Sequence, residues 1–233
     1  MGVDYMDHIG IMGAMNVEIQ NIQDKMENVK KENIAGFSFY VGRIGEKNVV
    51  LTCCGVGKVN AAACTQILID RFSVNCIINT GVAGGLYSDI KTCDIVISTD
   101  VTHHDVSKNQ LKTLFPFKEH FESDKHLVEI AIKSCEMNKI EGWNYYLGRI
   151  VSGECFVNDG VLKKRIIEEY SPYCVEMEGA AIGHVAYLNN IPFVVIRSIS
   201  DKADENASMS YESFEKVAAS QSARIVLSMI DMI

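Results

Sequence analysis

The stretch "IPFVVIRSISD", residues 191–201, decides the fold, because it begins as an apolar run and ends in polar side chains. A short run of β-branched and aromatic residues is typical of a buried strand. Its last five positions carry a cation, two hydroxyls and a carboxylate, from Arg197 to Asp201. In open α/β sheets, ligands bind at the carboxyl ends of the strands. We therefore expect the end of this strand to face a ligand.

Other apolar runs predict further strands, and several of them are separated by helical patterns. The expected strands are 8–14, 48–57, 75–85, 93–99, 148–153 and 173–178, and the expected helices include 17–31, 59–71 and about 211–231. Residues 35–54 have the pattern of a hairpin with its turn near Gly45, and the stretch from Pro116 to Asp124 is the least regular. This order predicts an α/β fold, a three-layer α/β/α arrangement around a mixed, mostly parallel sheet.

Length and composition indicate one globular unit with no nucleic-acid partner. The chain has 233 residues, of which 48% are hydrophobic and 22% are charged. This length favours a single domain over residues 1–233. With 22 Lys and Arg against 30 Asp and Glu, the net charge is -8, which repels a polyphosphate backbone. We expect neither nucleic acid nor a membrane as a partner.

The cysteines and the amino-terminal residues indicate a cytoplasmic protein without a metal. The eight cysteines include the neighbours Cys53 and Cys54 but form no CxxC pair. The start, "MGVDYMDHIGIMGAM", has acidic residues before a short apolar run and no cationic region, which argues against a signal peptide. No apolar span of 18 residues occurs. Reduced thiols in the cytoplasm fit this pattern.

Glycine-rich turns follow three of the expected strands. The first strand leads into "GAMNVE", which places Glu18 in the first turn of a helix, where an acid also complements the helix dipole. The stretches "CCGVGKVNAA" and "NTGVAGG" are turns whose amides suit an anion or a ribose, although packing alone also explains each turn. Neither is a Walker or dinucleotide-binding motif.

Carboxylates stand at two further strand ends. In "VEMEGAA", Glu176 and Glu178 are two apart and share one side if the strand persists, and a carboxylate suits the paired hydroxyls of a sugar. Asp201 follows a buried strand, so desolvation is expected to raise its pKa and to make it a proton donor, with Arg197 holding it or another acid. Acids at helix starts and in Asx turns are the alternative interpretation.

Taken together, these stretches resemble the 5′-methylthioadenosine/S-adenosylhomocysteine nucleosidases of the purine and uridine phosphorylase superfamily. The resemblance covers nearly the whole chain. The matching stretches are "GIMGAMNVE" (10–18), "CGVGKVNAA" (54–62), "INTGVAGGL" (78–86), "DIVIS" (94–98), "VSGECFVN" (151–158), "VEMEGAAIGHVA" (175–186) and "PFVVIRSISDKAD" (192–204).

The resemblance implies a nucleoside phosphorylase-like fold and a hydrolase of N-glycosidic bonds. It implies that Glu18 activates water, Asp201 protonates the purine N7 and Glu178 binds the ribose hydroxyls. Phe156 would stack on adenine, Val157 would bind its edge through the backbone, and Met177 would lie under the sugar. The remaining implied substrate-binding residues are Met15, Val82, Ala83, Gly84, Glu176, Arg197, Ser200 and Tyr211.

The resemblance further implies a homodimer in methionine salvage that uses no metal and no organic cofactor. Val56 and residues after Val101 would approach the partner subunit's site. The chain departs from the family pattern at Val82, Glu154 and Tyr211, and most of all across 102–120, which helps to shape the 5′ pocket. His103, His104 and Asp105 are adjacent on one stretch, so a structural or subunit contact is favoured over a metal triad.

Other functions remain open at the level of the sequence. Phosphorolysis needs cations around phosphate, whereas "GAMNVEI" offers Glu18 and no cation before Lys25, which favours water. The alternatives are a phosphorylase, a hydrolase of another adenine nucleoside such as aminodeoxyfutalosine, and a non-catalytic nucleoside sensor. Retention of both an acid and a water base argues against the sensor.

Overall fold

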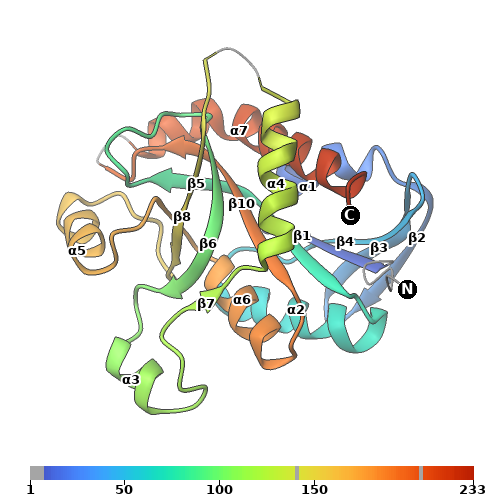
Figure 1. Cartoon of the computed structure of the whole chain (residues 1–233), viewed down its shortest axis with the longest axis horizontal. Coiled ribbons are helices and arrows are strands. Elements are labelled where there is room, and N and C mark those ends of the chain that lie inside the picture. Colours follow the sequence, from blue (N-terminus) through green and yellow to red (C-terminus); the bar gives the residue numbers. More distant parts are fainter. Residues whose placement is uncertain (1–7, 140–141, 205–206) are drawn as a thin grey trace.

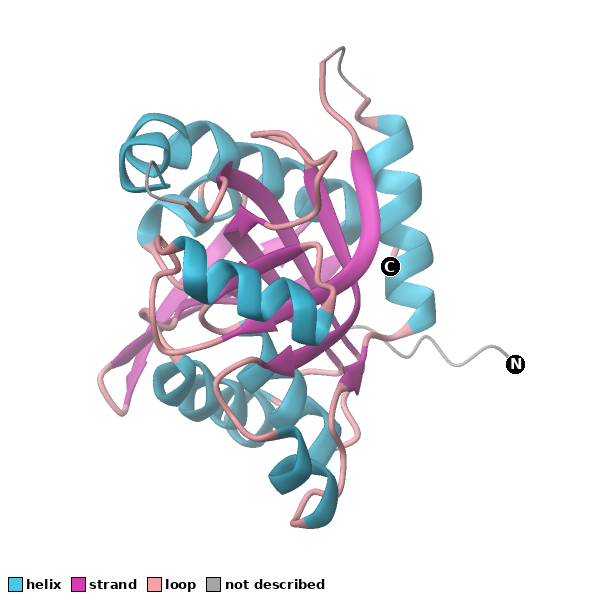
Figure 2. Ribbon diagram, turned by 90° about the vertical axis from the view of Figure 1, so that its left-hand side faces the viewer, coloured by secondary structure: helices cyan, strands magenta, loops and turns pink. Residues whose placement is uncertain are grey.

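The computed structural model describes residues 8–139, 142–204 and 207–233. A central sheet with helices on both faces forms the body of the molecule (Figures 1 and 2). The α/β fold with a mixed sheet is therefore confirmed. The acidic start of the chain, on which the argument against a signal peptide rests, lies at residues 1–7, outside the described ranges.

The elements alternate along the chain much as the sequence predicts. The strands are β1 (His8–Gly13), β2 (Glu27–Ile34), β3 (Phe37–Ile44), β4 (Lys47–Cys53), β5 (Cys76–Gly85), β6 (Ile95–His103), β7 (Phe121–Glu122), β8 (Tyr145–Ser152), β9 (Cys174–Glu176) and β10 (Phe193–Asp201). The helices are α1 (Asn16–Gln23), α2 (Lys58–Phe72), α3 (Lys108–Thr113), α4 (Lys125–Met137), α5 (Gly160–Tyr170), α6 (Gly179–Leu188) and α7 (Ala207–Ile230). Within the described ranges, no helix is both long and apolar enough to cross a membrane.

Alternating side chains on the central strands supply two separate hydrophobic cores. On β1, Ile9 and Ile11 belong to the core that includes residues of α1, α4 and α7. Met12 points to the other face, where α2 and α6 supply the core. Because neighbouring side chains of a strand point to opposite faces, a continuous apolar run serves both cores at once. This is why the central strands carry so few polar residues before their ends.

The sheet is mixed, and one half of it curls into a closed ring. Parallel pairings join β1 to β4 and β5, β5 to β10, and β8 to β6 and β9. Antiparallel pairings join β10 to β6 and β5 to β9, so that β5, β10, β6, β8 and β9 close on themselves. Gly84 of β5 consequently pairs with Asp201 on one side and with Val175 on the other. The ring thus brings the ends of β9 and β10 to one place.

The predicted helix over 17–31 is wrong in its second half. Helix α1 ends at Gln23, and residues 27–34 form β2, which pairs antiparallel with β3 and carries a bulge between Glu27 and Lys30. The side chains of β2 are almost all exposed, so burial does not select the helical spacing there. Pairing with β3 decides the conformation instead. The predicted hairpin is confirmed as β3 and β4, which are separated by Gly45 and Glu46.

The predicted strand over 173–178 is shorter than expected. Strand β9 ends at Glu176, and Glu178 is the N-cap residue of α6. The expectation that both acids lie on one side of a persisting strand is therefore wrong. They nevertheless approach a common partner, Arg197 in the middle of β10.

Candidate active site

A cavity of about 560 Å³ lies where the ends of β1, β5, β9 and β10 meet the first turns of α1 and α7. Its described lining residues are Ala14, Met15, Glu18, Val56, Val82, Ala83, Gly84, Phe156, Val175, Glu176, Met177, Glu178, Ser200, Asp201, Ser208, Tyr211 and Glu212. Two of the residues singled out from the sequence do not line it. Val157 borders a much smaller adjoining hollow, and Arg197 lies behind the wall.

Glu18 is almost wholly buried, and its carboxylate is held by the backbone. One oxygen, Oε2, accepts hydrogen bonds from the amides of Ala14 and Met15 at 2.7 and 2.9 Å, while Oε1 accepts from the Val82 amide at 3.0 Å. Burial raises the pKa of Glu18, and the positive charge of Arg197 and the three amides oppose that rise. The contacts to Ala14 and Met15 lie within the start of the same helix, whereas the contact to Val82 comes from β5. The contact to Val82 holds the carboxylate at the wall of the cavity.

Gly81 makes room for this carboxylate. A Cβ atom at position 81 would stand 2.4 Å from Glu18 Oε1 and 3.3 Å from Arg197 Nη1. The first distance is shorter than a Cβ contact allows and the second is tight, so a side chain at position 81 would push Glu18 away from the Val82 amide. The glycine in "NTGVAGG" is therefore required by a close approach at the site.

Asp201 ends β10 and is 1% exposed. Its Oδ1 accepts from the Ala203 amide and its Oδ2 from the Ser200 hydroxyl, both at 2.8 Å. Burial raises the pKa of Asp201, and the charge of Asp204 adds to the rise. These two hydrogen bonds and the positive charge of Lys163 lower the pKa. The expected direction of the shift is confirmed. A carboxyl in this environment can carry a proton into the cavity at a higher pH than an exposed one.

Glu178 is also buried, and only one of its two carboxylate oxygens accepts a hydrogen bond from a described residue. Its Oε1 accepts from the Gly57 amide at 2.8 Å, and Oε2 lies 3.9 Å from Arg197 Nη2, beyond hydrogen-bond range. Burial and the negative charge of Glu176 raise the pKa of Glu178, and Arg197 opposes them. The glycine turn before α2 thus contributes one amide to this acid, as turns of this kind suit anions.

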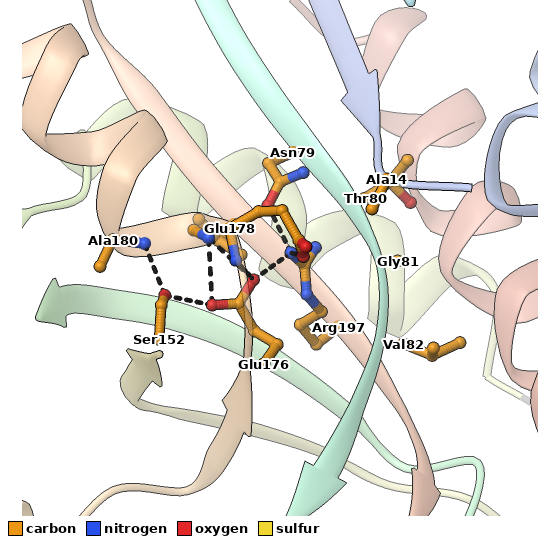
Figure 3. Close-up of polar contacts among 12 residues, drawn as sticks. Ala14, Asn79, Thr80, Gly81, Val82, Ser152, Glu176, Glu178, Ala180 and Arg197 are labelled. Carbon is orange, nitrogen blue, oxygen red and sulfur yellow. Dashed lines mark hydrogen bonds and ion pairs between the residues drawn. The ribbon is translucent and has the colours of Figure 1, made fainter. Parts of the chain in front are cut away.

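Glu176 and Arg197 form a buried ion pair beside these acids (Figure 3). Arg197 Nη2 lies 2.5 Å from Glu176 Oε2, and the amides of Glu178 and Gly179 donate to the same carboxylate. The guanidinium is 2% exposed. The sequence left open which acid Arg197 holds. It contacts Glu176, whereas the hydrogen bonds to Asp201 come from Ser200 and Ala203.

Ser208 and Glu212 line the cavity, but the sequence did not single them out. They lie on the first turns of α7 together with Tyr211, at positions i, i+3 and i+4. This spacing puts the three residues on one face of the helix. The sequence did not indicate this face, because the helix was expected to start near Tyr211, whereas α7 starts at Ala207. The Tyr211 hydroxyl donates to Glu215 at 2.7 Å and reaches the Met15 sulfur at 3.1 Å.

His103, which ends β6, and His104 belong to no metal cluster among the described residues. Among the residues of 8–139, 142–204 and 207–233, no group of three His, Cys, Asp or Glu side chains is arranged to hold an ion. Asp105 instead pairs with Lys58 at 2.5 Å and accepts from the Glu154 amide at 3.0 Å. These contacts tie the segment before Phe156 to the start of α2.

Comparisons with known proteins agree with this fold and cavity. A sequence model described as the phosphorylase superfamily matches residues 8–231. A 5′-methylthioadenosine/S-adenosylhomocysteine nucleosidase of Bacillus pumilus is 39% identical over 95% of this chain and 97% of its own. The corresponding nucleosidase of Treponema pallidum is 36% identical over 96% of this chain and 92% of its own.

Solved structures give the same picture. A 5′-methylthioadenosine/S-adenosylhomocysteine nucleosidase of Neisseria meningitidis, in complex with methylthio-immucillin-A, superposes with a TM-score of 0.93 at 37% identity, covering 98% of this chain and 100% of that one. A futalosine hydrolase of Helicobacter pylori gives a TM-score of 0.90 at 30% identity, covering 98% and 99%.

The fold and the acid-lined cavity are those of an enzyme that hydrolyses N-glycosidic bonds. The chain belongs to the phosphorylase superfamily and, within it, to the family of the 5′-methylthioadenosine/S-adenosylhomocysteine nucleosidases.

Proposed function

We propose that the chain hydrolyses the N-glycosidic bond of 5′-methylthioadenosine and S-adenosylhomocysteine, releasing adenine and the 5-thioribose. The observation that carries the proposal is that Glu18, Glu178 and Asp201 line one cavity although they come from distant parts of the sequence. Splitting this bond places positive charge on the sugar and negative charge on the purine. It therefore calls for an acid at the base and an activated water at the sugar.

Asp201 is the acid of this mechanism and Glu18 is the base. The bond between C1′ and N9 breaks with its electrons going to the purine, and Asp201 donates a proton to N7. A water oxygen bonds to C1′ and gives its proton to Glu18. A positioned acid or base contributes roughly 10² to 10⁴ in rate. The raised pKa of Asp201 supports its role, because it keeps the proton on the carboxyl at higher pH.

The other cavity residues bind the parts of the nucleoside. Glu178 accepts from the ribose 2′- and 3′-hydroxyls through its free Oε2, and Met177 lies under the sugar. Phe156 stacks on adenine and Val157 binds its edge through the backbone. Met15 and Tyr211 surround the 5′ substituent, where their side chains already touch. Val82, Ala83 and Gly84 complete the wall, Ser200 holds Asp201, and Glu176 and Arg197 support Glu178.

Water is favoured over phosphate as the nucleophile. Among the described residues that line the cavity there is no lysine or arginine, whereas five carboxyl groups face it. Arg197, whose positive charge acts on Glu18, is already paired with Glu176. A phosphate dianion would meet repulsion at this wall, and water would not.

We further propose a cytoplasmic homodimer, folded as one domain over 1–233, that acts in methionine salvage. Exposed apolar side chains support the dimer, because Val56 at the cavity rim is 48% exposed and Leu114, Phe115 and Phe117 are 58%, 73% and 68% exposed. Light scattering on the purified chain is expected to give twice the monomer mass. A monomer at micromolar concentration would contradict the dimer, and fractionation of cells that express the chain tests the location.

One incubation tests the activity. The purified chain is mixed with 5′-methylthioadenosine, with and without phosphate, and the sugar product is identified. Free methylthioribose in both buffers is the expected result. A sugar 1-phosphate that forms only with phosphate would indicate a phosphorylase, and binding without turnover would indicate a sensor. Because a futalosine hydrolase shares the fold, aminodeoxyfutalosine is offered in parallel, and its faster cleavage would favour the sibling activity.

A further inference from the structure

Two polar residues stand behind the cavity wall and have no role in the proposed mechanism. Asn79 lies on β5 and Ser152 ends β8, and both are fully buried. Neither is among the residues that line the cavity. Burying an amide and a hydroxyl is unfavourable unless their hydrogen bonds are made, so the partners of these groups indicate what they do.

Asn79 fixes one side of the Arg197 guanidinium. Its Oδ1 accepts from Arg197 Nη2 at 2.6 Å (Figure 3). Its Nδ2 donates to the Met12 carbonyl at 2.8 Å. The amide therefore links β10 through β5 to β1. Arg197 Nε has no hydrogen-bond partner among the described residues, and the guanidinium is held through its Nη atoms.

Ser152 fixes the carboxylate on the other side. Its hydroxyl donates to Glu176 Oε1, and its oxygen accepts from the Ala180 amide at 2.7 Å (Figure 3). Ala180 is in the first turn of α6, the helix that Glu178 caps. One serine thus anchors both Glu176 and the start of the helix that carries Glu178.

These anchors decide which carboxylate the guanidinium contacts. Arg197 Nη2 lies 2.5 Å from Glu176 but 3.9 Å from Glu178 Oε2. The guanidinium carries only hydrogen-bond donors and Glu178 Oε2 is an acceptor 3.9 Å away, so a released guanidinium can move onto Glu178. It would then occupy the oxygen that a sugar hydroxyl needs.

We propose that Asn79 and Ser152 are positioning residues that hold Arg197 on Glu176 and thereby keep Glu178 Oε2 free for the sugar of a nucleoside. The inference rests on the proposed function, because it assumes that Glu178 binds ribose. It predicts a defect that is confined to ligands with a sugar. Adenine alone, which makes no contact with Glu178 in the proposed mode, should be unaffected.

The test compares two ligands in the same variant by titration calorimetry. The ligands are adenine and 5′-methylthiotubercidin, a nucleoside that lacks N7 and so cannot be protonated there. Ser152→Ala is expected to weaken nucleoside binding by about tenfold, the effect of one lost hydrogen bond to a charged group, while adenine binding changes less than about twofold. Asn79→Ala is expected to show the same selective loss. Ser152→Thr keeps the hydroxyl and is expected to bind the nucleoside as the wild type does.

Ser98 offers a matched control. It is also a fully buried serine, its hydroxyl lies 2.6 Å from the Ser123 hydroxyl, and it accepts from the Val195 amide at 2.9 Å. Neither of these hydrogen bonds involves a carboxylate. Ser98→Ala should therefore lower the melting temperature as much as Ser152→Ala does, but leave the ratio of the two affinities unchanged.

The outcomes separate this inference from the proposed function. If the wild-type chain releases no adenine from 5′-methylthioadenosine, the proposed function is overturned and the inference falls with it. If it does release adenine but folded Ser152→Ala and Asn79→Ala bind both ligands as the wild type does, or lose both equally, only the inference is overturned. If Ser152→Ala does not fold, Asn79→Ala and the isosteric Ser152→Cys decide the question.

Discussion

Glu18 and Asp201 are buried carboxyl groups on the same cavity, but the protein surrounds them differently. Glu18 accepts three backbone hydrogen bonds and has Arg197 nearby. Asp201 accepts hydrogen bonds from one amide and one hydroxyl, while the charge of Asp204 raises its pKa and that of Lys163 lowers it. Donors and cations favour the ionised form of a carboxyl, and burial without them favours the neutral form. Burial raises the pKa of both groups, and the larger set of donors around Glu18 supports the proposed division, with Glu18 as the base and Asp201 as the acid.

The largest test removes each group in turn. Glu18→Gln and Asp201→Asn keep the shape of the side chain but remove the base and the acid, so each is expected to lower kcat by roughly 10² to 10⁴. Adenine release from 5′-methylthioadenosine measures the loss, and circular dichroism checks the fold. A nucleoside with a better leaving purine should partly restore Asp201→Asn and leave Glu18→Gln slow. Near wild-type rates in both variants would contradict the proposed roles of Glu18 as base and Asp201 as acid.

Two glycine substitutions test how closely the backbone packs against Glu18 and against Asp201. Gly81→Ala would put a Cβ 2.4 Å from Glu18 Oε1, while Gly84→Ala would put one 3.0 Å from Asp201 Oδ1. Displacing a reacting group by about 1 Å can cost on the order of 10² in rate, so Gly81→Ala is expected to lower kcat by about that factor. Gly84→Ala needs a smaller shift and should cost less. Equal losses, or a larger loss for Gly84→Ala, would contradict the packing argument.

The serine beside Asp201 allows a pH test. The Ser200 hydroxyl stabilises the ionised form of Asp201 and so lowers its pKa. Ser200→Ala removes this donor, and the pKa of Asp201 rises further. Because the mechanism needs a protonated Asp201, the alkaline limb of the kcat/KM profile should move to higher pH. The acid limb, which reports ionisation of Glu18, should stay in place. A shift of the alkaline limb to lower pH would show that Asp201 is not the group responsible.

The smallest expected effect is on stability. Burial raises the pKa of Glu178 above its ordinary value, so the folded chain binds more protons than the unfolded chain between the two pKa values. The free energy of unfolding therefore falls as pH rises through that window. Glu178→Gln has no proton to lose at this position. Between about pH 5 and pH 8 its free energy of unfolding should therefore fall less than that of the wild type, with a difference on the order of 1 kcal/mol. Parallel curves for the variant and the wild type in urea denaturation would contradict the assignment.

Much of the fold could be predicted because apolar runs and strand ends are local features. The residues of β10 and the hairpin of β3 and β4 are fixed by patterns within one stretch of chain. The conformation of 27–34 is not, because its exposed side chains fit a helix and a strand equally and the partner strand decides. Ring closure through β5 and β10 likewise depends on contacts between distant segments.

Some residues of the site can likewise be recognised from the sequence, and others only from the structure. Glu18, Glu178 and Asp201 stand at strand ends and turns, where a polar residue after an apolar run is a visible signal. The partner of Arg197 is not visible, since it depends on where the turn after β9 folds back. The roles inferred for Asn79 and Ser152 escape sequence patterns for a related reason. Asn79 lies within the buried strand β5 and Ser152 ends β8, and the inferred roles follow only from their partners across the sheet.

The most direct test of the base and acid assignment is a crystal structure of the Asp201→Asn variant with 5′-methylthioadenosine bound. We expect the purine N7 within hydrogen-bond distance of the side chain at position 201, and a water held by Glu18 on the face of the ribose opposite adenine. A nucleoside whose N7 points away from position 201, or whose C1′ has no water path to Glu18, would contradict the account.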